Sequence, residues 1–210
     1  MKRMLITLCL AMFFASVSQA GIRITEWMYD GAGDEFIEFT NIGTSVIDMT
    51  DWSFDDSSRT PGSADLSAFG DVAPGESVLL VEATADAFRT DWGLAPTVKI
   101  IGESTQNLGR NDEINLYDAL GELVDRLTYG DQDIPGTIRT QNKSGNPISP
   151  AVLGANHASD WVLASVGDVY GSYASTGGDV GNPGDHVIPE PTTVVMFFAM
   201  LVAAGLVRRR

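Results

Sequence analysis

Short segments in which apolar and polar residues alternate recur through the middle of the chain. Alternation with a period of two is typical of a β-strand that buries one face. Between these segments lie turn residues such as Asn41 and Gly43, and Pro74 with Gly75. Many short strands at near-regular spacing predict an all-β sandwich. The strand segments are 22–28, 36–40, 46–49, 52–54, 77–81, 98–101, 114–117 and 123–129.

Two local features sharpen this picture. The last two strand segments flank residues 118–121, where Asp118 opens and Gly121 closes a tight turn, so we expect a β-hairpin. Residues 84–93 predict one short helix, with Thr84 as its N-cap and Gly93 at its end. Phe88 and Trp92 lie four residues apart, and we expect the helix to cross an opening of the sandwich with both rings facing the core.

The first twenty residues have the pattern of a secretory signal peptide. Lys2 and Arg3 precede an apolar run over 4–15, and residues 18–20 are mostly small. The run is too short to span a membrane comfortably, so we expect cleavage between Ala20 and Gly21 rather than a permanent anchor. The chain is therefore expected to be exported.

A second apolar run, at about 193–207, lies near the C-terminus and is followed by Arg208, Arg209 and Arg210. Fifteen helical residues rise about 22 Å, which is short of a hydrocarbon core of about 30 Å. The run is thus a marginal transmembrane helix. The three arginines form a basic end that stays in the cytoplasm while the rest of the chain is exported.

This C-terminal end resembles the PEP-CTERM sorting signal of Gram-negative bacteria. The motif Pro189-Glu190-Pro191, the apolar helix and the basic end occur in the order of that family. The resemblance implies processing near the motif by the membrane enzyme exosortase, transfer to the cell surface, and an association with exopolysaccharide. A plain one-span tail anchor is the alternative.

Four regions follow from these patterns. Residues 1–20 are the signal peptide, 21–166 the β-sandwich, 167–186 a stalk rich in Gly, Ser and Asp, and 187–210 the sorting signal. The stalk has little to bury, and we expect it to be loosely ordered.

The charge and cysteine content exclude whole classes of function. The chain has 13 Lys and Arg against 28 Asp and Glu, a formal net charge of −15. Nucleic-acid binding needs cationic groups that neutralise phosphates, so we expect no nucleic-acid partner. The one cysteine, Cys9, lies in the leader, so the mature chain has no disulfide and no thiolate site.

Candidate catalytic residues do not form a convincing set. His157 lies in a loop and His186 in the stalk, and neither belongs to a zinc or nucleophile motif. The acid pairs Asp34-Glu35, Asp55-Asp56 and Asp112-Glu113 would have to face each other across a groove to act as a glycosidase. Neighbouring residues on a strand point to opposite faces, so a small secreted hydrolase that uses such acids is only an alternative.

Calcium is the cofactor that these acids suit best. Hard oxygen ligands in loops bind Ca²⁺, and an exported protein meets millimolar concentrations of it. The candidates are Asp30, Asp34 and Glu35, or Asp131 and Asp133, without EF-hand spacing. The alternative interpretation is a solvated acidic face that keeps the protein soluble. Without calcium, we expect no cofactor.

Residues from Ile22 to about Arg139 resemble the lamin-tail domain, an immunoglobulin-like β-sandwich. The opening strand 24–28, the segment 34–43, the segment 47–56 and the late hairpin carry the resemblance, whereas 108–113 is looser than the family pattern. Trp27, Trp52 and Trp161 suit the core of a sandwich, and a sugar-stacking role would need a ring exposed on one face.

These inferences combine into one expected function. The chain is expected to be a non-enzymatic binding or structural module at the cell surface or in the extracellular matrix. It starts as a precursor tethered to the inner membrane and is processed by signal peptidase and exosortase. Its partners would be exopolysaccharide or other surface proteins. A calcium-dependent adhesion module is the other alternative.

Overall fold

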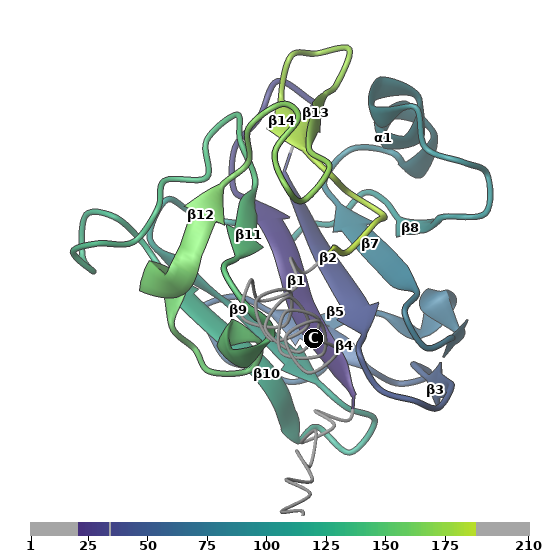
Figure 1. Ribbon diagram of the computed structural model, residues 1–210. Coiled ribbons are helices and arrows are strands. Elements are labelled where there is room, and N and C mark those ends of the chain that lie inside the picture. Colours follow the sequence, from purple (N-terminus) through teal and green to yellow (C-terminus); the bar gives the residue numbers. More distant parts are fainter. Residues whose placement is uncertain (1–20, 34, 188–210) are drawn as a thin grey trace, which may run out of the picture.

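The alternating segments pair into two β-sheets that pack face to face (Figure 1). The structure is a computed structural model that describes residues 21–33 and 35–187. The larger sheet has six strands in the order β12-β11-β1-β2-β7-β8, and the smaller has four in the order β10-β9-β4-β5. All neighbouring strands in these sheets are antiparallel except β7 and β8. The predicted all-β sandwich is therefore confirmed.

The elements have the following bounds. The large sheet contains β1 (Ile22–Met28), β2 (Phe36–Asn41), β7 (Ser77–Val81), β8 (Lys99–Ile101), β11 (Gly145–Pro147) and β12 (Trp161–Leu163). The small sheet contains β4 (Ser53–Asp55), β5 (Ala64–Asp65), β9 (Asp112–Tyr117) and β10 (Leu123–Tyr129). Two short ribbons pair β3 (Ile47–Asp48) with β6 (Asp71–Val72), and β13 (Tyr173–Ala174) with β14 (Val180–Gly181). The helices are α1 (Ala85–Trp92) and three 3-10 turns, at Ser67–Phe69, Pro150–Val152 and Ala158–Asp160.

The main core lies between the two sheets. Ile37 and Phe39 of β2 point inward and meet Ile114 and Leu116 of β9, and all four are buried. The expected core role of two tryptophans is confirmed: the rings of Trp27 and Trp161 lie 4.8 Å apart, edge to face. Trp52 packs against the same core but is only half-buried.

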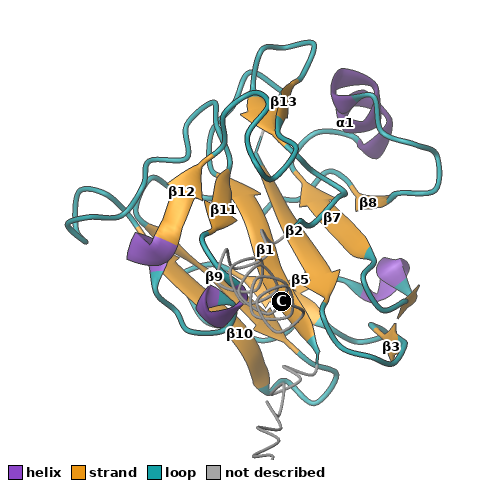
Figure 2. Ribbon diagram, viewed as in Figure 1, coloured by secondary structure: helices purple, strands orange, loops and turns teal. Residues whose placement is uncertain are grey.

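Helix α1 forms where the sequence predicts it. The Thr84 hydroxyl accepts a hydrogen bond from the backbone N–H of Ala87 at 3.3 Å, and Gly93 ends the helix with a φ of 64°. The helix does not cross an opening of the sandwich, however. The helix lies beside the large sheet near β7 and β8 (Figure 2). Its aromatic side chains belong to a second apolar cluster on the outer face of that sheet, because the outward positions of β1, β2 and β7 are apolar at this end. The cluster contains Met28, Phe36, Leu79, Val81, Phe88 and Trp92.

The predicted hairpin is also confirmed. Strands β9 and β10 are antiparallel neighbours, and the backbone N–H of Gly121 donates to the carbonyl of Asp118 at 2.9 Å. The Asp118 carboxylate accepts the N–H groups of Leu120 and Glu122, both at 2.9 Å.

The expected stalk, 167–186, is wrong. Residues 172–186, which we name the C-terminal strap, fold against the outer face of the large sheet and include the ribbon β13–β14 (Figure 1). Ser172, Ser175, Asp179 and Asn182 are buried. A segment with few apolar side chains still becomes ordered when other residues satisfy its backbone N–H groups, and here the Tyr173 ring also packs against Trp92, with the ring centres 5.6 Å apart. The folded unit therefore extends well beyond residue 166.

Close contact between strap and sheet requires small residues. A Cβ on Gly181 would lie 2.8 Å from Oε1 of Glu26, so a side chain at this position would displace the strap. Glycine content, which the sequence analysis took as a sign of looseness, here permits tight packing.

The predicted signal peptide, 1–20, and transmembrane helix, about 193–207, lie outside the described residues. Within 21–33 and 35–187, no helix has the length and apolar character needed to cross a bilayer.

Candidate functional site

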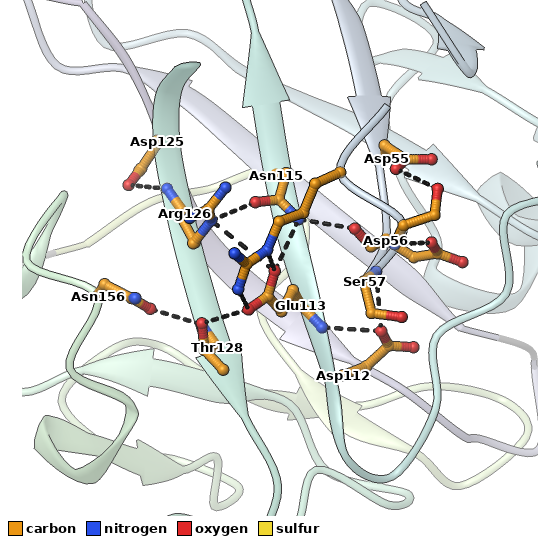
Figure 3. Close-up of polar contacts among 12 residues, drawn as sticks. Asp55, Asp56, Ser57, Asp112, Glu113, Asn115, Asp125, Arg126, Thr128 and Asn156 are labelled. Carbon is orange, nitrogen blue, oxygen red and sulfur yellow. Dashed lines mark hydrogen bonds and ion pairs between the residues drawn. The ribbon is translucent and has the colours of Figure 1, made fainter. Parts of the chain in front are cut away.

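Polar side chains gather on the outward face of the four-stranded sheet, with Glu113 of β9 at their centre (Figure 3). The Arg59 guanidinium donates to both oxygens of the Glu113 carboxylate, at 2.7 Å from Nε and 2.6 Å from Nη2. The Thr128 hydroxyl donates to the same carboxylate at 3.0 Å. A bidentate Arg–carboxylate pair fixes the position and the orientation of both groups. We name Arg59, Glu113, Asn115, Arg126 and Thr128 the Glu113 cluster.

Strand geometry brings this cluster together. Glu113 lies opposite Thr128 and Asn115 lies opposite Arg126 in the β9–β10 ladder, and residues two apart on a strand share a face. The Asn115 side chain accepts a hydrogen bond from Nε of Arg126 and donates to the backbone carbonyl of Asp56 at 2.7 Å. The cluster thus ties the hairpin to the loop after β4.

The acids of this region are held in their ionised form. Hydrogen bonds from Arg59 are the main reason that the pKa of Glu113 falls to about 2, although burial acts to raise it. For Asp55, burial also acts to raise the pKa, but the Thr60 N–H and the Ser58 hydroxyl outweigh it and the pKa is lowered. A general acid at neutral pH needs a raised pKa, so neither carboxyl suits that role.

A hollow of about 480 Å³ opens beside the cluster. The Tyr129 hydroxyl is buried at its wall and has no hydrogen-bond partner among the described residues, and burial raises its pKa well above the usual value. The volume falls within the range of small-molecule sites. Its lining residues are Ser57, Arg59, Asn111, Asp112, Glu113, Thr128, Tyr129, Asp133 and Ile134.

The hollow suits binding better than catalysis. Asp112 accepts hydrogen bonds from the backbone N–H groups of Ser57, Gly109 and Glu113, and Glu113 is held by Arg59. Asp112 and Glu113 therefore do not form a free acid–base pair with each other. The arrangement can bind a polar ligand.

A second polar cluster lies under the strap, at positions that no motif in the sequence marks. Glu26 of β1 and Glu38 of β2 are directly opposed across the strands and are both 0% exposed. Oε1 of Glu26 accepts the N–H of Asn182 at 2.9 Å, and Oε2 of Glu38 accepts the N–H of Gly184 at 2.7 Å. The two carboxyl groups thus hold the strap on the sheet.

Burial makes both of these carboxyl groups weak acids. Burial, with the nearby charge of Glu38 next in size, raises the pKa of Glu26 well above its usual value. Burial also raises the pKa of Glu38 to about 7, against hydrogen bonds from Thr25, Thr40 and Gly184 that lower it. The sequence contains one weak indication that these glutamates are buried: both lie within strand segments rich in apolar residues. Outward positions of antiparallel strands usually face water, so a glutamate at such a position is normally interpreted as an exposed residue.

Three of the calcium candidates, Asp30, Glu35 and Asp131, are bound to other groups of the protein. Asp30 accepts a hydrogen bond from the Gln141 amide at 2.6 Å, and both oxygens of Glu35 accept the Leu108 N–H, the shorter contact being 2.7 Å. Asp34 lies outside the described residues, and Asp131 forms an ion pair with Arg110 at 2.6 Å. In residues 21–33 and 35–187, no three His, Cys, Asp or Glu side chains are placed to hold a metal ion. Calcium binding stays a hypothesis.

Neither histidine belongs to the Glu113 cluster or to the Glu26–Glu38 pair. Nδ1 of His157 lies 3.1 Å from a carboxylate oxygen of Asp160, at an exposed position. His186 is the last residue of the strap, and burial lowers its pKa to about 4.

The sorting residues lie outside the described part of the chain. This applies to Ala20, to the motif Pro189, Glu190 and Pro191, and to the basic end Arg208, Arg209 and Arg210. Gly21, on the other side of the expected cleavage point, is the first described residue. Their roles stay predictions.

Comparison with known proteins supports the fold. A search of curated proteins gives no match. The model of the lamin tail domain family matches residues 15–131, more than half of the chain, and includes every strand of the small sheet together with β1, β2, β7 and β8. The strap and β11–β12 lie beyond the match. This match and the two packed sheets together show that the chain belongs to the lamin tail domain family, whose members are immunoglobulin-like, non-catalytic modules.

Proposed function

We propose that the chain is an exported, non-enzymatic binding or structural module that acts at the cell surface or in the extracellular matrix. The family match is the observation that carries this proposal, since lamin tail domains are β-sandwich modules. The Glu113 cluster agrees with it, because its acids are bound to an arginine or to backbone N–H groups rather than poised for proton transfer.

The two ends of the chain determine how it would be exported and processed. The signal peptide directs export with cleavage after Ala20, and the Pro189-Glu190-Pro191 motif is recognised by exosortase, which processes the membrane-tethered precursor. Proline fixes its own φ, lacks a backbone N–H and biases the preceding residue to extended backbone, so the motif stays unpaired in a form that a processing enzyme can bind. Surface polysaccharide and other surface proteins are the partners that this route suggests.

The strap changes how processing would occur. Its hydrogen bonds to the sheet continue to Gly184, and the motif begins at Pro189. An enzyme that cuts at the motif would work only a few residues from the folded surface. Release would then leave the strap and both sheets complete.

Truncation after Val187 tests the sorting role. The truncated chain keeps every contact of the strap, so it should fold as the full chain does. We expect it to be exported but to be lost from the surface fraction. A second variant, with Pro189 and Pro191 both changed to alanine, should stay in the inner membrane. If the truncated chain reaches the same surface fraction as the full chain, the proposed sorting role is wrong.

A further inference from the structure

A second hollow, of about 410 Å³, lies at the end of the sandwich where β1 begins. Six separate segments converge there: the start of β1, the loop after β2, strand β3, the residue before β4, the β9–β10 turn and the start of β10. The lining residues are Gly21, Gly43, Thr44, Ser45, Ile47, Trp52, Asp118 and Val124.

Trp52 sets this hollow apart from the rest of the surface. The indole N–H groups of Trp27, Trp92 and Trp161 are sealed inside the protein without a hydrogen-bond partner among the described residues. Trp52 is the half-buried one of the four, and it lines the hollow together with Ile47 and Val124. It meets the condition for a stacking platform, an aromatic ring that is partly exposed and rigidly held.

The backbone around Trp52 makes that platform rigid. The Trp52 N–H donates to the carbonyl of Met49 at 3.1 Å, and the Trp52 carbonyl accepts the N–H of Leu66 at 2.9 Å. Met49 and Leu66 are fully buried. The backbone at Trp52 is therefore fixed to the core, and its side chain both packs against that core and lines the hollow.

The rim of the hollow is polar. Thr44 and Ser45 supply hydroxyl groups. Asp118 uses Oδ1 to accept two N–H groups of its own turn, which leaves Oδ2 to accept a hydrogen bond from a ligand. An apolar floor with a few placed polar groups is the usual composition of a small-molecule site.

We propose that this hollow binds one ring of a neutral saccharide, which stacks on Trp52 and donates a hydroxyl to Asp118. A pyranose ring has a face of C–H groups and a rim of hydroxyls, which match the floor and the rim of the hollow. The inference rests on the proposed function, because a non-enzymatic module acts through what it binds.

Charge decides between neutral and acidic sugars. The described lining contains Asp118 and no Lys, Arg or His side chain, although the Arg23 guanidinium donates to the carbonyl of the lining residue Val124 at 3.2 Å. The whole chain carries a formal net charge of −15, which repels anions at a distance as well. Sugars that carry carboxylate, sulfate or phosphate groups should therefore bind more weakly than neutral ones.

Removal of the signal peptide during export would add one more polar group to the hollow. Cleavage after Ala20, which the proposed function requires, would leave the α-amino group of Gly21 at the rim. That group is a cation near neutral pH that adds a hydrogen-bond donor for a sugar hydroxyl and offsets the charge of Asp118. The expected discrimination against acidic sugars therefore rests on the net negative charge of the whole chain. The protein to test is thus the exported chain rather than the cytoplasmic precursor.

Saturation-transfer NMR on the exported full chain, kept in detergent where the tail is retained, tests the proposal. The probes are short neutral oligosaccharides of glucose, mannose and galactose, with oligogalacturonate as the acidic comparison. We expect saturation transfer to at least one neutral probe and weaker transfer to the acidic one. Trp52→Ala should weaken binding about tenfold or more.

Two further variants keep the test decisive if Trp52→Ala fails to fold. Asp118→Asn retains the Oδ1 acceptor that holds the turn but loses the charge, and it should weaken binding about fivefold. Val162→Ser, on the exposed side of β12 and outside the hollow, is the matched control and should bind like the original chain.

The proposal is overturned by any of three results: no transfer to any neutral probe, binding that Asp118→Asn leaves unchanged, or a preference for the acidic oligomer. None of these results bears on export or on processing of the tail. Conversely, a failure of the truncation experiment would not alter the NMR result, so the two proposals fail separately.

Discussion

At the scale of single residues, Glu113 shows how this acidic chain stabilises a surface carboxylate. Its side chain is only 8% exposed, and Arg59 and Thr128 occupy both of its oxygens. Its low pKa therefore reports a structural ion pair. Glu26 and Glu38 show the opposite case, because burial dominates and raises their pKa values.

Glu113→Gln should destabilise the fold by about 1–2 kcal/mol at pH 7, because it weakens charge-assisted hydrogen bonds to a partly exposed arginine. The pKa of Glu113 is depressed in the folded state, so its contribution is present above about 4.5 and is lost as the pH falls toward about 2. Urea unfolding at pH 7 and at pH 3 should show the difference between the two proteins shrinking. Glu122→Gln, at an exposed turn, is the control and should have no such pH-dependent effect.

Glu38→Gln should flatten the dependence of stability on pH. The pKa of Glu38 rises from 4.5 to about 7 on folding, so the folded state holds a proton that the unfolded state has released. Its stability contribution is complete below about 4.5 and is lost as the pH rises to about 7, at up to about 1.4 kcal/mol per pH unit. Urea midpoints from pH 4.5 to pH 8 should fall less for the variant than for the original chain. Equal slopes would show that Glu38 is not protonated in the folded state.

At the scale of elements, the strap lies beyond the family match, as do β11 and β12. Several of its anchors are carboxylates that accept backbone N–H groups across a long stretch of sequence. Asp91, at the end of α1, accepts the N–H of Gly177 at 2.7 Å. Asp179 within the strap accepts the N–H groups of Ala32 and Gly33 at 3.1 Å and 2.9 Å. Strap, helix and the loop after β1 are thus joined by hydrogen bonds.

Asp179→Ala should loosen the strap before it affects the sandwich. The change leaves two partly buried N–H groups without their acceptor, at a cost of about 1–3 kcal/mol. Hydrogen exchange should become faster in 172–184 and in 31–33, while the β9–β10 hairpin keeps its protection. Asp133→Ala, at an exposed loop position, should leave the whole exchange pattern unchanged. Uniformly faster exchange in the Asp179 variant would show that the strap is no separate cooperative unit.

At the scale of the whole molecule, local patterns missed the short strands β5, β6 and β11 to β14 but were enough to predict strands β1 to β4 and β7 to β10, the hairpin at Asp118 and the caps of α1. These depend on side-chain alternation and on residues a few positions apart. The strap could not be predicted in the same way, because its contact between Asn182 and Glu26 spans 156 positions. The outward-facing cluster around Phe88 and the buried pair Glu26–Glu38 were missed for a related reason. Both depend on what covers the outer face of a sheet, which alternation alone does not reveal.

The most direct test of the account is the intact mass of the protein recovered from its own host. A small tag fits in the turn at Pro135 and Gly136, where both residues are exposed and the strap is undisturbed. Cells, membranes and medium would be measured separately. We predict a chain that begins at Gly21, ends near Pro189–Pro191 and is found outside the inner membrane. A mass that retains Arg208–Arg210 and occurs only in membranes would contradict the account and identify the tail as a plain anchor.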